Sequence, residues 1–253
     1  MSASAEGLET RRRDLGPRSR PHSTSSTDAA ASRARRLLVS DLGPVAQLRA
    51  GRLGRRLPQL IVGLVLYGVS LGLMVRGNVG LAPWDVLHSG LIQHLPITLG
   101  QAVVVMSLVV LVLWIPLKEQ PGIGTIANAL IVGLSADATL WVLDEPGALA
   151  SRVALMVGGV VLCGAASGLY IGAQLGRGPR DGLMTGLARR TGLSIRLVRT
   201  LLEVAVVLVG LVLGGVLGAG TVAYALTIGP LTQFFLPYCL VALPAPSEVE
   251  VSS

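Results

Sequence analysis

Charged side chains are scarce in this sequence. They make up 14% of the 253 residues, whereas hydrophobic residues make up 51%. A soluble globular domain typically carries about 25% charged residues. The deficit argues against a water-soluble protein and predicts a chain whose main solvent is lipid.

Basic charge is also missing from the body of the chain. Residues 1–58 hold 12 of the 21 Lys and Arg but only 5 of the 14 Asp and Glu, which leaves 9 of each in residues 59–253. The net charge of +7 therefore belongs to the N-terminal region. A nucleic-acid-binding protein places its basic residues on a folded surface, so this distribution argues against nucleic acid as a partner.

Cysteines, metal ligands and catalytic motifs are few. Cys163 and Cys239 lie in apolar runs, where cysteine packs as a small hydrophobic residue rather than joining a disulfide framework. His88 and His94 are six residues apart, a spacing that does not place two metal ligands on one helix face. The sequence has neither a phosphate-binding Gly loop ending in Lys-Ser/Thr nor a nucleophile elbow. We expect no enzyme activity, no metal and no cofactor.

What the sequence does contain is six long apolar segments of 19 to 22 residues. A helix needs about 20 residues to cross the roughly 30 Å hydrocarbon core of a bilayer. Asp137 and Gln233 make the third and sixth segments the least apolar, so a five-span alternative stays open. The segments are Leu57–Val75, Leu99–Leu117, Ile123–Leu143, Val153–Ala173, Leu197–Leu217 and Val222–Leu243.

Arginines in the loops predict how the chain is inserted. The N-terminal region contains twelve and residues 174–199 contain six, whereas residues 76–98 contain one. Loops rich in Lys and Arg stay on the cytoplasmic side of the membrane. The pattern predicts a multi-pass protein of the bacterial inner membrane whose N- and C-termini are cytoplasmic.

The ends of the chain differ in composition from the body. Residues 1–56 are rich in Arg and Ser and have no sustained apolar period, which predicts a disordered cytoplasmic tail. Within it, Arg33–Arg56 would suit a short basic helix on anionic lipid headgroups. The remaining divisions are a first membrane repeat at 57–145, a second at 153–243, and a short cytoplasmic tail at 244–253.

An internal repeat relates the two membrane halves at an offset of 96 residues. A block of twelve residues beginning at Gly122 matches its copy at seven positions, and Pro83 and Asp85 fall on Pro179 and Asp181. Matching Pro, Asp and Thr in one ungapped register indicates a repeat rather than shared composition. Each half has three spans, so the second half must enter the membrane in the opposite orientation. The predicted fold class is an all-α membrane protein with six transmembrane helices in two inverted three-helix repeats, a design common in secondary transporters.

The Pro-x-Asp motif in each half opens a stretch that is too short and polar to span a membrane. Pro favours the first position of a helix, and Asp near the N-terminus gains from the helix dipole. Each half therefore carries a short helix, either interfacial or re-entrant. An interfacial helix only joins two spans. A re-entrant pair would place Asp85 and Asp181 across a central cavity, which suits a proton or cation and disfavours an anion unless Arg76 or Arg180 compensates.

Other charged residues lie within or beside the segments. Asp137 lies deep in the third segment, where a carboxylate should face protein or water. Glu203 in the fifth segment can pair with Arg199, one helical turn earlier. The residues expected to line a substrate or ion path are Asp85, Asp181, Asp137 and Arg76.

Glycines spaced four residues apart mark helix faces that allow two backbones to approach closely. They lie in the first and fourth segments, and we expect these two faces to meet at the interface between the repeats. Trp84, Trp114 and Trp141 fall near the predicted membrane faces and suit interfacial anchors. The packing glycines are Gly68, Gly72, Gly164, Gly168 and Gly172.

The stretch from Gly72 to Asp85 joins the end of the first segment to the first Pro-x-Asp motif. It resembles the bacterial YczE/YitT-type integral membrane proteins, in which a basic residue ends the first span and a Leu-Gly-x-x-x-Trp-Asp stretch follows. The resemblance covers residues 57–243 and implies a multi-span inner-membrane protein of a family with no settled biochemical activity, so no catalytic residues are carried over. The long Arg-rich tail departs from it. The matching residues, with Val in place of Leu, are Arg76, Val79, Gly80, Trp84 and Asp85.

Two functions fit these features. The first is a small secondary transporter or permease of unknown substrate, which the inverted repeat favours. The second is a non-transporting accessory or scaffold protein, which the scarcity of deep polar residues favours. The bilayer is the expected partner, with anionic lipids near the Arg-rich tail, and a homodimer or a membrane protein partner stays open.

Overall fold

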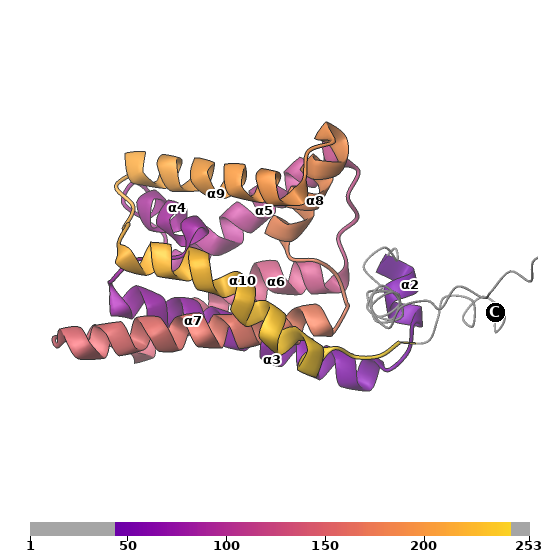
Figure 1. The fold of residues 1–253 in the computed structure, drawn as a ribbon, viewed down its shortest axis with the longest axis horizontal. Coiled ribbons are helices and arrows are strands. Elements are labelled where there is room, and N and C mark those ends of the chain that lie inside the picture. Colours follow the sequence, from indigo (N-terminus) through magenta and orange to yellow (C-terminus); the bar gives the residue numbers. More distant parts are fainter. Residues whose placement is uncertain (1–43, 244–253) are drawn as a thin grey trace, which may run out of the picture. The chain divides into compact units, whose positions relative to one another are not determined.

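The computed structural model describes residues 44–243, and all regular structure in that range is helical (Figure 1). The predictions for residues 1–43 and 244–253 lie outside the described residues. The helices are α2 (Pro44–Arg49), α3 (Leu53–Gly77), α4 (Pro83–Leu91), α5 (Leu99–Leu117), α6 (Ile123–Val142), α7 (Leu149–Gly172), α8 (Pro179–Thr191), α9 (Ile195–Val212) and α10 (Ala219–Cys239).

Five of the described helices are long and apolar enough to cross a membrane: α3, α5, α6, α7 and α10. α9 is not among them, because its 18 residues include two arginines and Glu203. The sequence predicted a longer fifth segment, Leu197–Leu217. The helix instead ends at Val212, and Gly214 takes a left-handed backbone with a φ of 80°. The prediction of six apolar spans is therefore supported for five.

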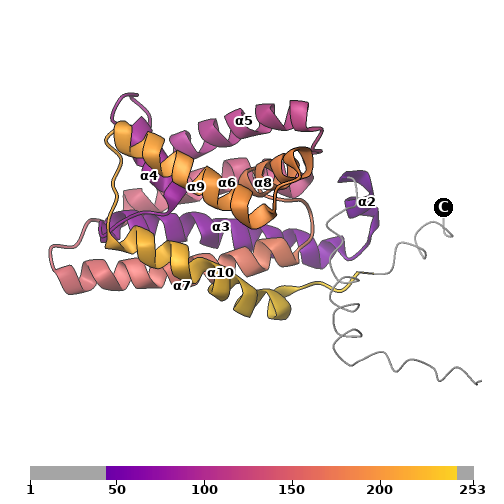
Figure 2. The ribbon, with the colours of Figure 1, turned by 45° about the horizontal axis from the view of Figure 1, so that its top comes forward.

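α3 and α7 lie side by side and run in opposite directions (Figure 1, Figure 2). A Cβ atom added at Gly63 would lie 2.8 Å from the backbone nitrogen of Tyr170, and one added at Gly159 would lie 2.7 Å from Cγ of Met74. Any side chain at these positions would push the helices apart. The two contacts are equivalent under the 96-residue offset, so both halves build this interface in the same way.

The glycines spaced four residues apart do pack closely, but against other helices. A Cβ atom added at Gly68 would lie 2.5 Å from the carbonyl oxygen of Val132 in α6, and one added at Gly164 would lie 2.6 Å from Cβ of Leu231 in α10. With 3.6 residues per turn, Gly68 lies on a different side of α3 from Gly63. The expectation that the two glycine faces meet each other is therefore wrong. The glycines that face the same two helices are Gly72, Gly168 and Gly172.

Each of the four main helices of the first half begins 96 residues before its counterpart in the second half. Backbone hydrogen bonds join the connecting segments of each half to the other half. The backbone nitrogen of Gly124, at the start of α6, donates to the carbonyl of Leu175, after α7, at 2.8 Å. The equivalent bond runs from Gly220 at the start of α10 to Val79 after α3 at 3.1 Å. The paired starts are Leu53 and Leu149, Pro83 and Pro179, Leu99 and Ile195, and Ile123 and Ala219.

Two arginines at equivalent positions of the repeat cap the C-terminal ends of α3 and α7. Arg56, which the sequence placed in the tail, lies inside α3 and is fully buried. Its guanidinium donates to the carbonyls of Ala173 and Gln174 after α7 at 2.8 and 2.6 Å. Arg152 makes the equivalent bonds at the end of α3. The last carbonyls of a helix have no partner within the helix, so each half supplies a C-terminal cap for the other.

The two halves differ in how their last two helices pack. In the first half α5 and α6 touch through their backbones: a Cβ atom added at Gly133 would lie 2.4 Å from the carbonyl oxygen of Gly100. The Asp137 carboxylate adds hydrogen bonds from Thr98 Oγ1 and from the Gly100 nitrogen. In the second half α9 and α10 pack little against each other. A Cβ atom at Gly229, the counterpart of Gly133, would meet nothing within 4 Å.

Replacing Arg56 by Gln should destabilise the fold, because four carbonyl oxygens lose a buried charged donor. We expect the free energy of unfolding to fall by about 2 to 4 kcal/mol, measured as a lower melting temperature of the protein in detergent micelles. Arg55→Gln is the matched control, because Arg55 is exposed. Equal effects of the two substitutions would contradict the capping role.

Gly133→Ala and Gly229→Ala form a matched pair at equivalent positions. The first should lower the free energy of unfolding by about 1 to 3 kcal/mol, because the new methyl group meets the backbone of α5. The second should leave it unchanged or raise it slightly, since Ala is a better helix former than Gly and no atom lies nearby. Thermal unfolding in detergent compares the two, and a loss in Gly229→Ala as large as in Gly133→Ala would show that α9 and α10 are packed together.

Candidate functional site

α4 and α8 begin at equivalent prolines and point their first residues into the protein. Pro83 and Pro179 occupy the first turn, where the missing N–H leaves no hydrogen bond unmade. α4 has 9 residues, so its length of about 13 Å is less than half the hydrocarbon thickness of a bilayer. Residues 83–90 are all buried. The helix therefore lies within the protein on every side, against α9 and α5.

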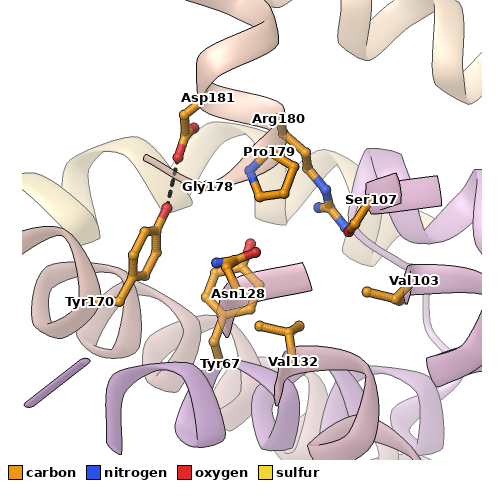
Figure 3. A pocket seen from close by; sticks show the side chains of 10 residues that line it. All are labelled: Tyr67, Val103, Ser107, Asn128, Val132, Tyr170, Gly178, Pro179, Arg180 and Asp181. Atoms are coloured by element: carbon orange, nitrogen blue, oxygen red, sulfur yellow. Dashed lines mark hydrogen bonds between the residues drawn. The ribbon is translucent and has the colours of Figure 1, made fainter. Parts of the chain in front are cut away.

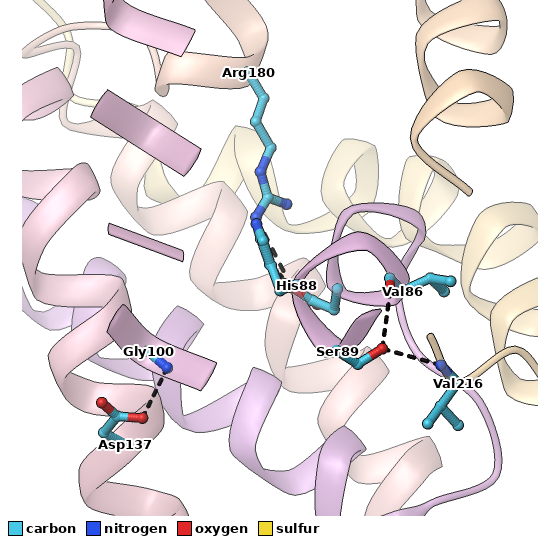
Figure 4. Close-up of polar contacts among 8 residues, drawn as sticks. Val86, His88, Ser89, Gly100, Asp137, Arg180 and Val216 are labelled. Carbon is cyan, nitrogen blue, oxygen red and sulfur yellow. Dashed lines mark hydrogen bonds and ion pairs between the residues drawn. The ribbon is translucent and has the colours of Figure 1, made fainter. Parts of the chain in front are cut away.

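Asp85 belongs to a polar cluster to which both halves contribute. Its Oδ1 lies 3.0 Å from Nδ1 of His88 and 3.9 Å from Nη2 of Arg180. Asp85 and His88 are each 1% exposed. Figure 4 shows Arg180 reaching from α8 toward His88 on α4. The guanidinium carbon of Arg180 also lies 5.1 Å from the ring centroid of Trp84. Trp84 occupies the position in the first half that is equivalent to Arg180 in the second.

Asp181 accepts a hydrogen bond from a tyrosine of α7, which packs against α3. Tyr170 of α7 donates its hydroxyl proton to Oδ2 of Asp181 at 2.8 Å (Figure 3). The rings of Tyr67 and Tyr170 meet edge to face, with centroids 6.0 Å apart. The carboxylates of both motifs thus accept a hydrogen bond from a fixed aromatic side chain, imidazole in one half and phenol in the other.

A cavity of about 50 Å³ lies beside Arg180 (Figure 3). This is room for a few water molecules. Its polar wall comes from Arg180, Asp181, Ser107, Asn128 and the two tyrosines, and Val103 and Val132 supply apolar surface. Helices α3, α5, α6, α7 and α8 all contribute to the lining.

Burial lowers the pKa of the His88 imidazole below its ordinary value, and the hydrogen bond with Asp85 opposes that shift only in part. The imidazole is therefore neutral at pH 7, and its Nδ1–H is the donor to the Asp85 carboxylate. The cluster then holds one positive charge, on Arg180, and two negative charges, on Asp85 and Asp181.

Asp137 and Arg76 do not join this cluster. Asp137 accepts a hydrogen bond from the Gly100 nitrogen at 2.8 Å (Figure 4), so it caps the N-terminus of α5. Arg76 donates to the carbonyl of Leu140 and lines a separate hollow of about 320 Å³. Of the four residues expected to line a path, the structure brings only the two motif aspartates together around Arg180.

Two of the three tryptophans lie inside the protein rather than at its membrane faces. Trp84 and Trp114 are 6% and 2% exposed, so the expectation that they are interfacial anchors is wrong. Trp141 is 88% exposed. Trp114 Nε1 donates to the carbonyl of Pro179 at 3.0 Å, which fixes the start of α8 against α5.

Several members of the site were missed in the sequence, although the repeat contained a signal for them. Each is a polar or aromatic residue at a position where the otherwise similar copies carry different side chains. In a chain this apolar, such positions are the ones that make the two halves chemically distinct. The pairs are Tyr67 and Cys163, His88 and Met184, Asn128 and Tyr224, Tyr170 and Met74, and Arg180 and Trp84.

Comparison with known proteins identifies the family of this chain. Residues 54–237 match a family described as a family of unknown function, DUF6198. The chain belongs to that family. The matched residues include both Pro-x-Asp motifs and every helix from α4 to α9.

Two bacterial relatives also align with most of this chain. An uncharacterized protein of Haemophilus influenzae is 41% identical over 177 residues, which are 70% of this chain and 81% of that protein. The uncharacterized membrane protein YczE of Bacillus subtilis is 31% identical over 177 residues, which are 69% of this chain and 82% of that protein. These matches confirm the YczE-type resemblance and identify a membrane protein. No solved structure matches the chain.

Acid should destabilise the fold through His88. The unfolded chain binds a proton there near the ordinary pKa of about 6.5, whereas the folded protein, whose His88 pKa is lower, does not. The unfolded state then binds more protons, so stability falls as the pH drops below about 6.5. We expect the melting temperature to fall less on acidification in His88→Gln than in the unchanged protein. His94→Gln, at an exposed histidine, should behave like the unchanged protein, and the same loss in all three would exclude His88 as the cause.

Proposed function

We propose that this membrane protein is a small secondary transporter or permease with six membrane spans, built as two inverted repeats. The observation that carries the proposal is the ionic cluster of Asp85, which is buried, with Asp181 and Arg180, which are partly buried. Buried charges contribute little net stability compared with well-packed apolar residues. In membrane proteins they mark substrate or ion pathways.

Antiparallel packing of equivalent helices supports the inverted repeat. α3 and α7 are counterparts that run in opposite directions, as two copies inserted from opposite sides of a membrane must. Their contacts, the crossing backbone bonds and the paired arginine caps all repeat under the same offset. Transporters of this design place their substrate site where the two copies meet, and the ionic cluster lies there.

α9 is proposed as the sixth span despite its charge. Its three charged residues lie in its first nine positions, and Arg199 and Glu203 neutralise each other at 2.9 Å, as the sequence predicted. The rest of the helix carries exposed apolar side chains such as Leu208 and Val212, which suit lipid. With α9 counted, the Arg-rich stretch 174–199 and both termini would lie on the cytoplasmic side.

The unequal packing of the two halves supports a transport cycle. α5 and α6 are closed on each other through Gly100 and Gly133, whereas α9 and α10 are apart at Gly229. If the two halves exchange these arrangements, the cluster between them is reached alternately from either side of the membrane. The inverted design provides the exchange without new contacts, because each half already has the conformation that the other would adopt.

A non-transporting accessory protein is the second candidate. The small size of the cavity beside Arg180 favours it, as does the exposed apolar surface of α9, which would suit a membrane partner. In that case the ionic cluster would only specify how the halves assemble, and the packing of α9 and α10 would not change.

Cysteine cross-linking distinguishes the two candidates without knowledge of a substrate. In a Cys163→Ala, Cys239→Ala background, we expect Thr98→Cys with Asp137→Cys to form a disulfide at once, since those side chains touch in the closed half. The equivalent pair, Ser194→Cys with Gln233→Cys, should cross-link slowly in membrane vesicles and only through excursions in which α9 closes on α10. Cross-linking one pair should suppress the other.

One outcome of this cross-linking experiment would exclude transport. If the second pair never links, with or without a proton gradient across the vesicle, while the first pair links fully, the halves do not exchange. The accessory function would then replace the proposal.

A further inference from the structure

We propose that the cavity beside Arg180 binds a small monovalent anion, and that Asp85 is the internal counter-ion whose place the anion takes. This deepens the proposed function, on which it rests, by naming the substrate class. The argument depends on three properties of the cluster: donors without partners, carboxylates that already have partners, and the balance of charge.

The Arg180 guanidinium lacks hydrogen-bond acceptors. A guanidinium carries five N–H donors, yet among the described residues no group accepts a hydrogen bond from it. Its contact with Asp85 is 3.9 Å long, beyond the range of a hydrogen bond, and its other neighbour is the face of the Trp84 ring. The Arg180 side chain is 22% exposed and lines the cavity. Its unfilled donors are therefore available to a ligand there.

Other donors around Arg180 are also free. The Ser107 hydroxyl and the Asn128 amide line the cavity, and neither is hydrogen-bonded to another residue in the part of the chain that the structure describes. The indole N–H of Trp84, on the ring beneath the guanidinium, is buried without a partner. Buried polar groups are rarely left unsatisfied, and each of these groups can donate a hydrogen bond.

The two carboxylates, in contrast, already accept hydrogen bonds. Asp181 accepts from Tyr170 at 2.8 Å, and Asp85 is paired with His88 at 3.0 Å. A cation entering the cavity would have to approach the positive charge of Arg180. An anion would meet an unfilled guanidinium whose planar fork suits carboxylate-like groups.

The dimensions of the cavity restrict the anion. About 50 Å³ admits a group of roughly three or four heavy atoms, because a cavity needs about 10 to 15 Å³ to hold one water molecule. Val103 and Val132 form an apolar wall that disfavours strongly hydrated divalent anions. Formate, nitrate and bicarbonate are suitable probes of this class.

Arg180 also carries the positive charge of the site. The other ionisable groups near Asp85 are Tyr67 on α3, Cys163 on α7 and Tyr224 on α10.

None of these neighbours supplies positive charge, so Arg180 is the only cation that faces Asp85 among the described residues. An anion in the cavity therefore competes with Asp85 for this one guanidinium.

The second half does not repeat this site. Trp84 stands at the position equivalent to Arg180, and Met184 at the position equivalent to His88. The described residues therefore form one anion site, where the two halves meet, and not one site in each half.

Anion binding to the purified protein in lipid nanodiscs tests the proposal. Sodium formate, nitrate and bicarbonate are titrated at constant ionic strength, with heat of binding and tryptophan fluorescence as readouts; Trp84 lies against Arg180 and reports on it. We expect saturable binding of at least one of the three anions. Arg180→Gln should abolish binding. Arg180→Lys, which retains the charge without the planar fork, should weaken it by about tenfold or more.

Two variants complete the design. Asp85→Asn should bind the anion more tightly than the unchanged protein, because its carboxylate no longer competes for the Arg180 guanidinium. Arg190→Gln, at an exposed arginine of the same helix, should bind like the unchanged protein.

Two results would overturn the proposal: no binding of any of the three anions, or binding that survives Arg180→Gln and Arg180→Lys unchanged. Each is separable from a failure of transport. Binding that needs Arg180 in a protein whose Ser194–Gln233 pair never cross-links retains the anion site and rejects the transporter. Cross-linking without anion binding does the reverse.

Discussion

Close approach of the α3 and α7 backbones is the contact on which the rest of the structure depends. Gly63 and Gly159 permit it because neither has a side chain to hold the helices apart. Once the two helices are aligned, their connecting segments fall beside the start of the opposite half, where Leu175 and Val79 accept backbone hydrogen bonds. Those bonds fix the points from which α4 and α8 start, and so bring the two Pro-x-Asp motifs to one place. Larger residues at the glycines would separate the motifs as well as the helices.

Inside this frame the chain places charges where water is scarce. Asp85 is 1% exposed and faces Arg180 across 3.9 Å, a distance too long for a hydrogen bond. Desolvation of both groups is costly, and attraction at this distance repays only part of the cost. A protein selected only for stability would fill the same volume with apolar side chains. The arrangement is better explained by a ligand or proton that completes it, and that explanation links the fold to the proposed function.

The sequence predicted the helices well, because long apolar runs and caps are local signals. α5 begins and ends where its apolar run does, and the Pro-x-Asp motifs begin short helices at the expected residues. Packing partners were harder to predict. The glycine spacing indicated close contacts without saying which helix supplies the other side, and the depth of Asp137 along its segment did not show that Thr98 and Gly100 lie beside it. Such information depends on the tertiary arrangement, which repeats and periodicity describe only in part.

The exchanged arginine caps have a consequence for biogenesis. The carbonyls at the end of α3 are capped by Arg152, which is synthesised only after the whole first half, and Arg56 caps the end of α7, which is synthesised later still. Neither half can reach its final form while it is alone in the membrane. Assembly is therefore a late event, in which one newly inserted half clasps another, and a chain truncated between the halves would remain a partly formed target for quality-control proteases. Two copies of a single half would form both caps only by pairing with each other in opposite orientations.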